Sequence, residues 1–260
     1  MFKSLSAALA AAVLVSSAAG AQEAVPTPPI AHTLPGGADY GAVLASPVRT
    51  DEDRSRDAAR MTEATLAFTG VRPGWKVGDM IMGGGFFTRA FSAAVGAEGR
   101  VVAWQPAEFI GFSETYARAA EAADQLPNVD VIRSPIGSPE FPAGLDLVFT
   151  AQNYHDLHLR PFAEDTAARV NAAVFAALRP GGYYVILDHH AVDGSDLSVA
   201  DSLHRIDRET VVREVEAAGF QYSSEAAFLW RDDDPRTANV FDDSIRGRTS
   251  QFAIVFRKPD

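Results

Sequence analysis

The sequence has no cysteine among its 260 residues. This absence excludes disulfide bonds, thiolate metal sites and a cysteine nucleophile. Long hydrophobic runs are also missing, because no stretch after residue 21 approaches the roughly 20 apolar residues that a membrane-spanning helix needs. Basic residues are few, with 23 Lys and Arg against 34 Asp and Glu and a net charge of −11. A surface this acidic repels phosphate backbones, so we expect no nucleic-acid partner.

The first 21 residues have the pattern of an export signal. Lys3 supplies one positive charge, residues 5–15 are apolar, and Ala19-Gly20-Ala21 forms an A-x-A-like cleavage site. These three features are typical of a Sec-type signal peptide, with an uncleaved N-terminal anchor as the alternative. We therefore predict a signal peptide at residues 1–21 and a periplasmic or secreted protein that is free of the membrane after cleavage.

The rest of the chain divides into two parts of different composition. Residues 22–50 are rich in Pro, Gly and Ala, which indicates a leader that packs loosely or not at all. Residues 51–260 are enough for one α/β domain with a substantial core. We see no internal repeat and no second domain.

Helical and strand patterns alternate from residue 51 onward. Residues 183–188 form a continuous apolar run, as expected for a buried strand of a parallel sheet. Alternation with right-handed crossovers predicts a doubly wound, mostly parallel α/β sheet of the Rossmann-like kind, in which the last two strands pair as an antiparallel hairpin. We expect helices at 51–68, 86–95, 109–124, 162–178 and 208–218, and seven strands at 75–81, 100–104, 129–133, 145–150, 183–188, 221–229 and 251–256.

Several motifs occur in a familiar order along this pattern. They are Gly-Trp-Lys-Val-Gly-Asp at 74–79, three glycines at 83–85, Leu-Arg-Pro-Gly-Gly at 178–182 and a terminal hairpin strand. Together they resemble the class I S-adenosylmethionine-dependent methyltransferases over residues 51–259. The stretches at 83–89, 153–158 and 188–190 look like a bacterial group of predicted methyltransferases. The resemblance implies a seven-stranded methyltransferase sheet, S-adenosylmethionine as cofactor and a small molecule as methyl acceptor.

The glycine run marks the expected cofactor site. Ligands of an open parallel sheet bind beyond the carboxyl ends of the strands, where the strand order reverses. Gly83, Gly84 and Gly85 follow the first strand directly, so the backbone there can approach a ligand closely. The resemblance implies that this loop holds the methionine end of the cofactor, with Asp79 nearby. The alternative is a turn that serves only tight packing between strand and helix.

Two positions depart from the family pattern. The family usually has glycine two residues after the acidic residue, where this chain has Ile81. Its second strand usually ends in Asp or Glu, which accepts hydrogen bonds from the ribose hydroxyls, and here Gln105 takes that place. An amide lacks the charge-assisted strength of a carboxylate, so we expect ribose binding to be weakened.

Five of the six histidines fall where the sheet should bring them together. They follow two strands that we expect to be neighbours, or precede the next helix, at positions 155, 158, 189, 190 and 204. Imidazole beside a carboxylate can remove a proton near neutral pH. We therefore expect His155 with Asp156, or His189 with Asp188, to act as the base. Hydrogen bonding within the rim is one alternative.

A metal site is the other alternative for these histidines. Asp188 and His189 with His155 or His158 would offer the mixed imidazole and carboxylate ligands that suit zinc, iron, nickel or copper. The chain lacks a histidine pair four residues apart on a helix, which would have been a more specific metal signal.

The residues after the fourth strand are the expected acceptor site. Many relatives of the resembled family bind the acceptor there, which implies contacts from Asn153, Tyr154 and His158. Tyr154 would stack on a planar acceptor, or else pack within a lid.

Export conflicts with methyl transfer, because S-adenosylmethionine is made in the cytoplasm and no ready supply of it is expected outside. The leading hypothesis is a methyltransferase that acts on an unidentified small molecule. The alternative is an exported ligand- or metal-binding protein that keeps the fold without methyl transfer. The changes at Ile81 and Gln105 favour the alternative, and the glycine loop with the Asp-His rim favours retained small-molecule chemistry.

Overall fold

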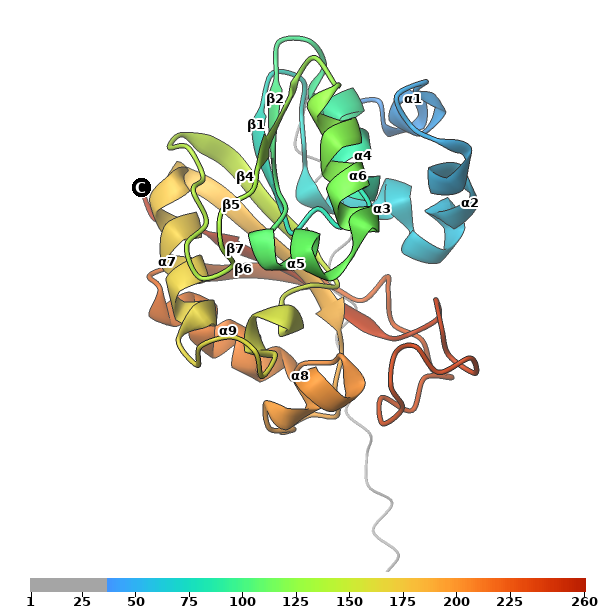
Figure 1. Cartoon of the computed structure of the whole chain (residues 1–260), viewed down its shortest axis with the longest axis vertical. Coiled ribbons are helices and arrows are strands. Elements are labelled where there is room, and N and C mark those ends of the chain that lie inside the picture. The colour runs from blue at the N-terminus through green and yellow to red at the C-terminus, as the bar shows by residue number, and fades with distance from the viewer. Residues whose placement is uncertain (1–36) are drawn as a thin grey trace, which may run out of the picture.

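The computed structural model describes residues 37–260 (Figure 1). The predicted signal peptide at 1–21, and the leader as far as residue 36, lie outside the described residues. Within 37–260 no helix is both long and apolar enough to cross a membrane.

The described chain is built around a seven-stranded sheet in the order β3-β2-β1-β4-β5-β7-β6. Strands β1 to β5 pair in parallel, and β7 is antiparallel to both β5 and β6. The predicted doubly wound sheet with a C-terminal antiparallel hairpin is therefore confirmed. The strands are β1 (Lys76–Met80), β2 (Arg100–Trp104), β3 (Val129–Ile132), β4 (Leu145–Ala151), β5 (Leu178–His189), β6 (Gln221–Ala226) and β7 (Gln251–Arg257).

All five predicted helices are present, two of them interrupted, and the short elements α1, η1 and α8 were not predicted. The helix expected at 51–68 breaks at Met61, which has a left-handed φ of 46°. The helix expected at 109–124 breaks at Ser113, whose extended backbone lets its hydroxyl cap the second half. The helices are α1 (Tyr40–Ala45), α2 (Asp51–Arg60), α3 (Thr62–Thr69), α4 (Phe86–Val95), α5 (Ala107–Phe112), α6 (Glu114–Asp124), the 3-10 turn η1 (His155–His158), α7 (Thr166–Ala177), α8 (Ser198–Leu203) and α9 (Arg208–Ala217).

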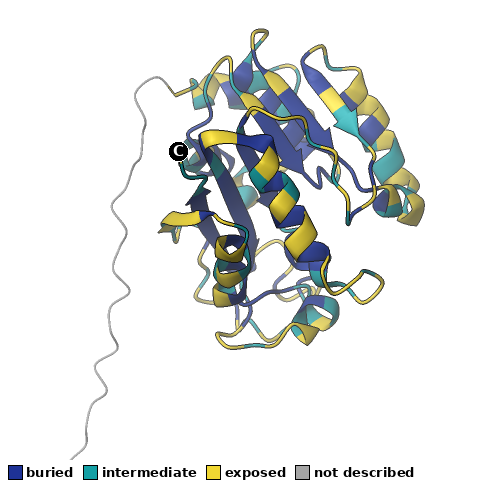
Figure 2. Cartoon of the chain, turned by 90° about the vertical axis from the view of Figure 1, so that its left-hand side faces the viewer, coloured by how far each residue is buried: buried dark blue, intermediate teal, exposed yellow. Residues whose placement is uncertain are grey.

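The sheet is buried on both faces, and its strand residues alternate between two cores. On β2, Val101 and Ala103 pack into the core beneath α3 and α4, whereas Val102 and Trp104 pack into the core beneath α7 and α9. Figure 2 shows the result, with the central strands buried and the helices exposed mainly on the side away from the sheet, while the edge strand β6 is largely exposed. Because both core layers are closely packed, they hold in place the strand ends that carry the functional residues.

The end of the predicted leader is more ordered than expected. Residues 40–45 form α1, capped by the Asp39 carboxylate, and the side chains of Val43 and Arg49 are buried. Arg49 donates to Asp57 through both terminal nitrogens, so this segment is fastened to α2. The expectation of loose packing is therefore wrong for residues 37–50, because a composition rich in Pro and Gly does not reveal a buried arginine.

Candidate active site

A cavity of about 720 Å³ opens at the carboxyl ends of β1, β4 and β5. The strand order reverses between β1 and β4, so the cavity lies at the topological switch point where open α/β sheets bind ligands. Its volume is within the range of small-molecule sites, about 300–1,000 Å³. The expected position of the ligand site is therefore matched by a cavity large enough to hold one.

Two of the three predicted glycines line this cavity. Gly83 has a left-handed φ of 55°, and a Cβ atom added to Gly84 would meet no other atom within 4 Å. Gly85 instead caps α4, and a Cβ there would lie 2.8 Å from the Arg89 guanidinium. Gly83 and Gly84 thus present bare backbone to the cavity, whereas Gly85 is required by the packing of the turn.

Asp79 is a buried acid at the end of β1 whose side chain lines the cavity. Its Oδ2 accepts a hydrogen bond of 2.5 Å from the Thr88 hydroxyl. Burial raises the pKa of Asp79 to about 6, although the Thr88 hydrogen bond and the nearby Arg89 and Arg60 lower it. A carboxylate with this pKa beside a cavity suits a cationic group of a ligand.

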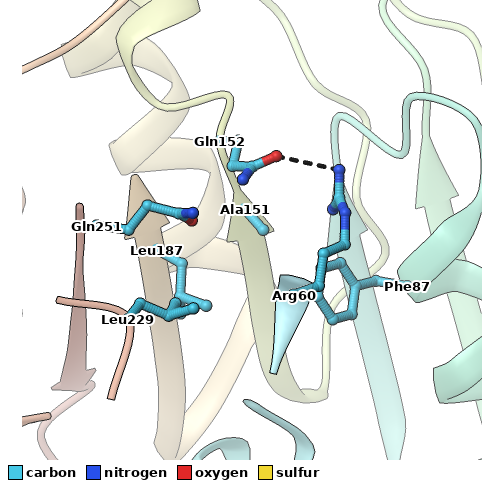
Figure 3. Close-up of a pocket in the computed structure, with 7 residues that line it drawn as sticks. All are labelled: Arg60, Phe87, Ala151, Gln152, Leu187, Leu229 and Gln251. Carbon is cyan, nitrogen blue, oxygen red and sulfur yellow. Dashed lines mark hydrogen bonds between the residues drawn. The ribbon is translucent and has the colours of Figure 1, made fainter. Parts of the chain in front are cut away.

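Arg56 and Arg60, one helical turn apart on α2, bring positive charge to the same cavity. Arg60 donates to Gln152 Oε1 over 3.0 Å, and Figure 3 shows these two side chains meeting above Phe87. Burial lowers the pKa of Arg60 to about 10, so it remains cationic at neutral pH. The sequence held a signal for this pair, because residues four apart on a helix share a face, but the expected site omitted it.

An ion pair between helices holds α2 beside the cavity. Arg89 on α4 donates to both carboxylate oxygens of Asp53, each over 2.6 Å. Asp53 also closes a capping box with Thr50 at the start of α2. Since Asp53 is almost fully buried, this contact fixes the position of α2 beside the glycine loop.

His155 is buried between two carboxylates at the ends of β4 and β5. Its Nδ1 lies 2.8 Å from Asp188 Oδ1, and its Nε2 lies 3.3 Å from Asp156 Oδ1. Burial alone would lower the pKa of His155, but the charges of Asp188 and Asp156 raise it to about 9. Burial raises the pKa of Asp156 to about 6. The expected pair of His155 with Asp156 is formed, and Asp188 is the carboxylate that orients the ring.

His189 and His204 complete the group of histidines on the cavity wall. The ring centroids of His189 and His204 lie 6.0 Å and 5.5 Å from that of His155. The ring of His189 pairs with Thr249 Oγ1 over 2.8 Å, and only its backbone N–H reaches Asp188. Burial lowers the pKa of His189 to about 3. The ring of His189 therefore does not pair with Asp188 as expected for a base, because Asp188 is engaged with the ring of His155.

Two predicted acceptor residues are placed in the core instead of on the cavity wall. Tyr154 is fully buried; its hydroxyl donates to Glu214 Oε2 over 2.9 Å and accepts from Asn171. His158 Nε2 lies 3.1 Å from the same Glu214 oxygen. Because η1 is a tight helical turn, His155 and Asp156 face the cavity while Tyr154 and His158 face α9.

The remaining predicted residues have contrasting positions. Asn153 lines the cavity, and its Nδ2 donates to the carbonyl oxygens of Ile81 and Ala151, which ties the ends of β1 and β4 together. Gln105 follows β2 and is fully buried, and within the described chain neither atom of its amide has a hydrogen-bond partner. Gln105 thus does not form the cavity wall, where the family pattern would place an acid.

The segment between β6 and β7 forms the opposite wall, which sequence reasoning missed. Phe241, Arg246 and Thr249 belong to this wall. Arg205 anchors the segment through two hydrogen bonds of 2.9 Å to Asp234, with both side chains fully buried. The length of the segment, from residue 227 to 250, was the available signal. Further aromatic side chains from α5 and α6 line the entrance, namely Phe109, Phe112 and Tyr116.

Backbone strain gathers around the same cavity. Among the described residues, five other than glycine have positive φ, and three of them line the cavity, namely Ile81, Gln152 and His204. Ile81 has φ 61°, which is costly for a β-branched residue, and it stands where the resembled family has glycine. Ile81 therefore has the left-handed backbone conformation that a glycine would adopt at this position. Strain of this kind persists at functional sites.

The strand order and the cavity at the β1–β4 switch point define the fold of class I S-adenosylmethionine-dependent methyltransferases. A SAM-dependent methyltransferase from Aquifex aeolicus superposes with a TM-score of 0.55 at 19% identity, over 84% of this chain and 98% of that one. Fibrillarin of Aeropyrum pernix with natively bound S-adenosyl-L-methionine gives 0.51 at 15%, over 77% and 76%. No protein-family model and no curated protein sequence matches the chain.

The same fold also occurs in an enzyme of another reaction class. The [4+2]-cyclase SpnF superposes with a TM-score of 0.56 at 16% identity, over 78% of this chain and 81% of that one. At such identities the likeness shows the fold, and the reaction has to be argued from the site.

Proposed function

We propose that this protein is an S-adenosylmethionine-dependent methyltransferase that acts on a small molecule. The observation that carries the proposal is the coincidence of three features at one place. The cavity lies at the β1–β4 switch point, Gly83 and Gly84 border it with bare backbone, and Asp79 reaches it from the end of β1. The resemblance to class I methyltransferases implies that these positions hold the methionine end of the cofactor, at the switch point where open α/β sheets bind ligands.

The charges on the cavity wall match that end of the cofactor. The methionyl group of S-adenosylmethionine carries one ammonium and one carboxylate. Asp79 offers a carboxylate for the ammonium, and Arg60 and Arg56 offer guanidinium groups for the carboxylate. Since all three lie at the glycine-loop side of the cavity, the chain can bind the zwitterion with complementary charges.

The rest of the cavity suits a small acceptor. Transfer of a methyl group depends mainly on holding donor and acceptor in line at short distance. Phe109, Tyr116 and Phe241 give apolar surface for a compact molecule, and His155 with Asp156 supplies polar contacts for its nucleophilic atom.

Gly84 allows a clean test of cofactor binding. A methyl group at this position meets no protein atom within 4 Å and the backbone φ is not left-handed, so Gly84→Ala should leave the melting temperature unchanged. Because Gly84 borders the cavity, we expect the added methyl group to weaken binding of S-adenosylhomocysteine at least about tenfold, or about 1.4 kcal/mol. Isothermal titration calorimetry with S-adenosylmethionine and S-adenosylhomocysteine measures this loss.

Gly137→Ala is the matched control. A Cβ at Gly137 is equally free of contacts, but this glycine is not part of the cavity wall. It should bind both ligands as the unchanged protein does. Absence of any heat of binding at millimolar ligand in the unchanged protein, or equal affinities for the two alanine variants, would count against the proposal.

We also propose that the protein is exported, on the basis of residues 1–21. Mass spectrometry of the protein isolated from its native host should then find Gln22 as the first residue. Retention of residues 1–21 in a cytoplasmic fraction would contradict this, and would leave the binding site unaffected.

A further inference from the structure

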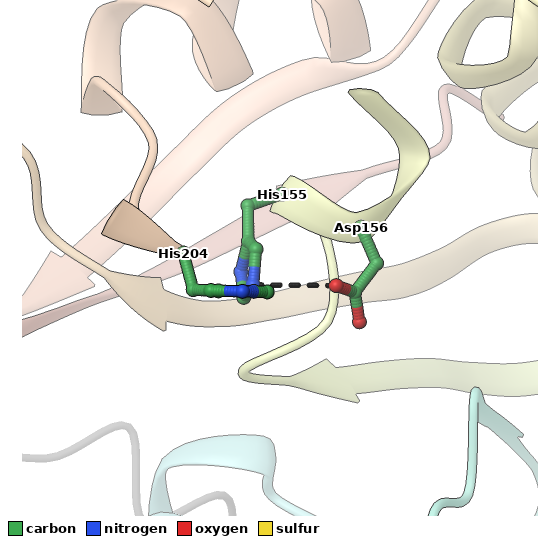
Figure 4. Close-up of side chains that lie close together, drawn as sticks. All are labelled: His155, Asp156 and His204. Atoms are coloured by element: carbon green, nitrogen blue, oxygen red, sulfur yellow. Dashed lines mark ion pairs between the residues drawn. The ribbon is translucent and has the colours of Figure 1, made fainter. Parts of the chain in front are cut away.

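Three side chains on the cavity wall bring potential metal ligands together. His155 and Asp156 come from η1, and His204 comes from the end of α8. One ligand atom from each lies within 4.8 Å of the others, and Figure 4 shows the three side chains converging. His204 holds a left-handed φ of 53°, so the backbone maintains a strained conformation that directs this ring to the cluster.

Asp188 prepares His155 for coordination through its second nitrogen. The Asp188 carboxylate lies 2.8 Å from Nδ1 of His155 and also accepts the backbone N–H of that residue over 2.7 Å. Histidines that bind metals usually donate the other ring N–H to a carboxylate in this way, which fixes both tautomer and orientation. Nε2 of His155 is thereby left to face Asp156 and His204.

The charge of the cluster calls for a cation. Asp156 and Asp188 are two buried or nearly buried carboxylates, and neither forms an ion pair with Lys or Arg within residues 37–260. His155 lies between them, and its protonated ring would offset one of the two charges, whereas a divalent ion bound at its Nε2 would offset both. Two carboxylates desolvated together are costly unless a positive charge compensates them.

The distance between His155 and Asp156 fits two ligands of one ion better than a hydrogen bond. Nε2 of His155 lies 3.3 Å from Asp156 Oδ1. A charge-assisted hydrogen bond between such groups would measure about 2.7–2.9 Å. Two ligands at about 2.1 Å from a tetrahedral ion stand about 3.4 Å apart. His204 offers a ring nitrogen that has no hydrogen-bond partner within the described chain.

We propose that His155, Asp156 and His204 bind a divalent transition-metal ion with an open coordination position toward the cavity. Two imidazoles and one carboxylate are the ligand set of catalytic zinc sites and of non-haem iron(II) sites. This set differs from the one expected from sequence, because Asp188 supports a ligand and His189 is bound to Thr249. The ion would bind and polarise an oxygen or nitrogen of whatever occupies the cavity.

The test measures metal binding by the untagged full-length protein. After treatment with a chelator, the protein is dialysed against Zn²⁺ and analysed for bound metal, with Fe²⁺ and Mn²⁺ in parallel. We expect one equivalent of Zn²⁺ or Fe²⁺, and affinity at least about tenfold lower in both His204→Ala and Asp156→Asn. Two variants are used, and circular dichroism reports whether each of them is folded.

His190→Gln provides the matched control. His190 Nε2 also lies 3.3 Å from a carboxylate, that of Asp193, but this pair lacks a third ligand within the described chain and faces Trp230 and Phe252. Its metal content should equal that of the unchanged protein. The proposal is overturned if no metal is retained, or if folded His204→Ala and Asp156→Asn bind as well as His190→Gln. Titration of the same samples with S-adenosylhomocysteine reports separately on the proposed methyl-donor site.

Discussion

Replacing Arg205 with methionine should lower the free energy of unfolding by about 3–5 kcal/mol, since it leaves a buried charge without its partner. Arg205 and Asp234 are both fully buried and share two hydrogen bonds. Arg205 also donates to the carbonyl oxygens of His190 and Ala238, which methionine cannot replace. Denaturant unfolding monitored by circular dichroism gives the change.

The control for Arg205 lies in the same segment. Arg248 pairs with Asp233, and both side chains are more than half exposed. Arg248→Met should therefore change the free energy of unfolding by less than about 1 kcal/mol. Similar losses for Arg205→Met and Arg248→Met would show that burial does not decide the strength of these pairs. The comparison also bears on function, because the segment that Arg205 anchors carries Phe241 and Thr249 to the cavity.

The sheet was predictable from sequence because its signals are local. Most strands are short apolar runs, such as 183–188, with glycine or proline nearby, and each core face follows from alternation along the strand; the polar edge strand β6 is the exception. The interruption at Met61 was not predictable, since no glycine marks its left-handed conformation. Local patterns therefore give elements and their order, while breaks imposed by packing do not appear in them.

The site was only partly predictable because its partners come from different strands. Sequence adjacency suggested that Asp188 would serve His189, yet Asp188 faces His155, which follows the neighbouring strand β4. The family resemblance implied a place for Tyr154 at the acceptor site, and the turn of η1 directs it into the core. The glycine loop was predictable because three glycines directly after a strand let the backbone approach a ligand closely. Side-chain direction, by contrast, depends on contacts that only the folded chain defines.

Asp79 carries a cost for folding that its proposed role explains. Its pKa is about 6 in the folded protein and 3.8 in a solvated chain, because burial penalises the charged form. The folded state is thus unpenalised below pH 4, loses stability as the pH rises to 6, and above pH 6 is destabilised by about 3 kcal/mol. Asp79→Asn removes that charge and keeps an oxygen for the Thr88 hydroxyl.

We therefore expect Asp79→Asn to be more stable than the unchanged protein at pH 7, by up to about 3 kcal/mol, and equally stable below pH 4. The same variant should bind S-adenosylhomocysteine about ten- to a hundredfold more weakly, because the ligand ammonium loses its carboxylate. In the unchanged protein that affinity should rise as the pH increases through 6. Asp243→Asn, at an exposed aspartate, should alter neither property. If Asp79→Asn binds the ligand as tightly as the unchanged protein, Asp79 is not part of the methionyl site. If it is no more stable at pH 7, the buried charge of Asp79 does not destabilise the fold. A gain in stability together with a loss of binding would show that Asp79 serves the ligand and lowers the stability of the fold.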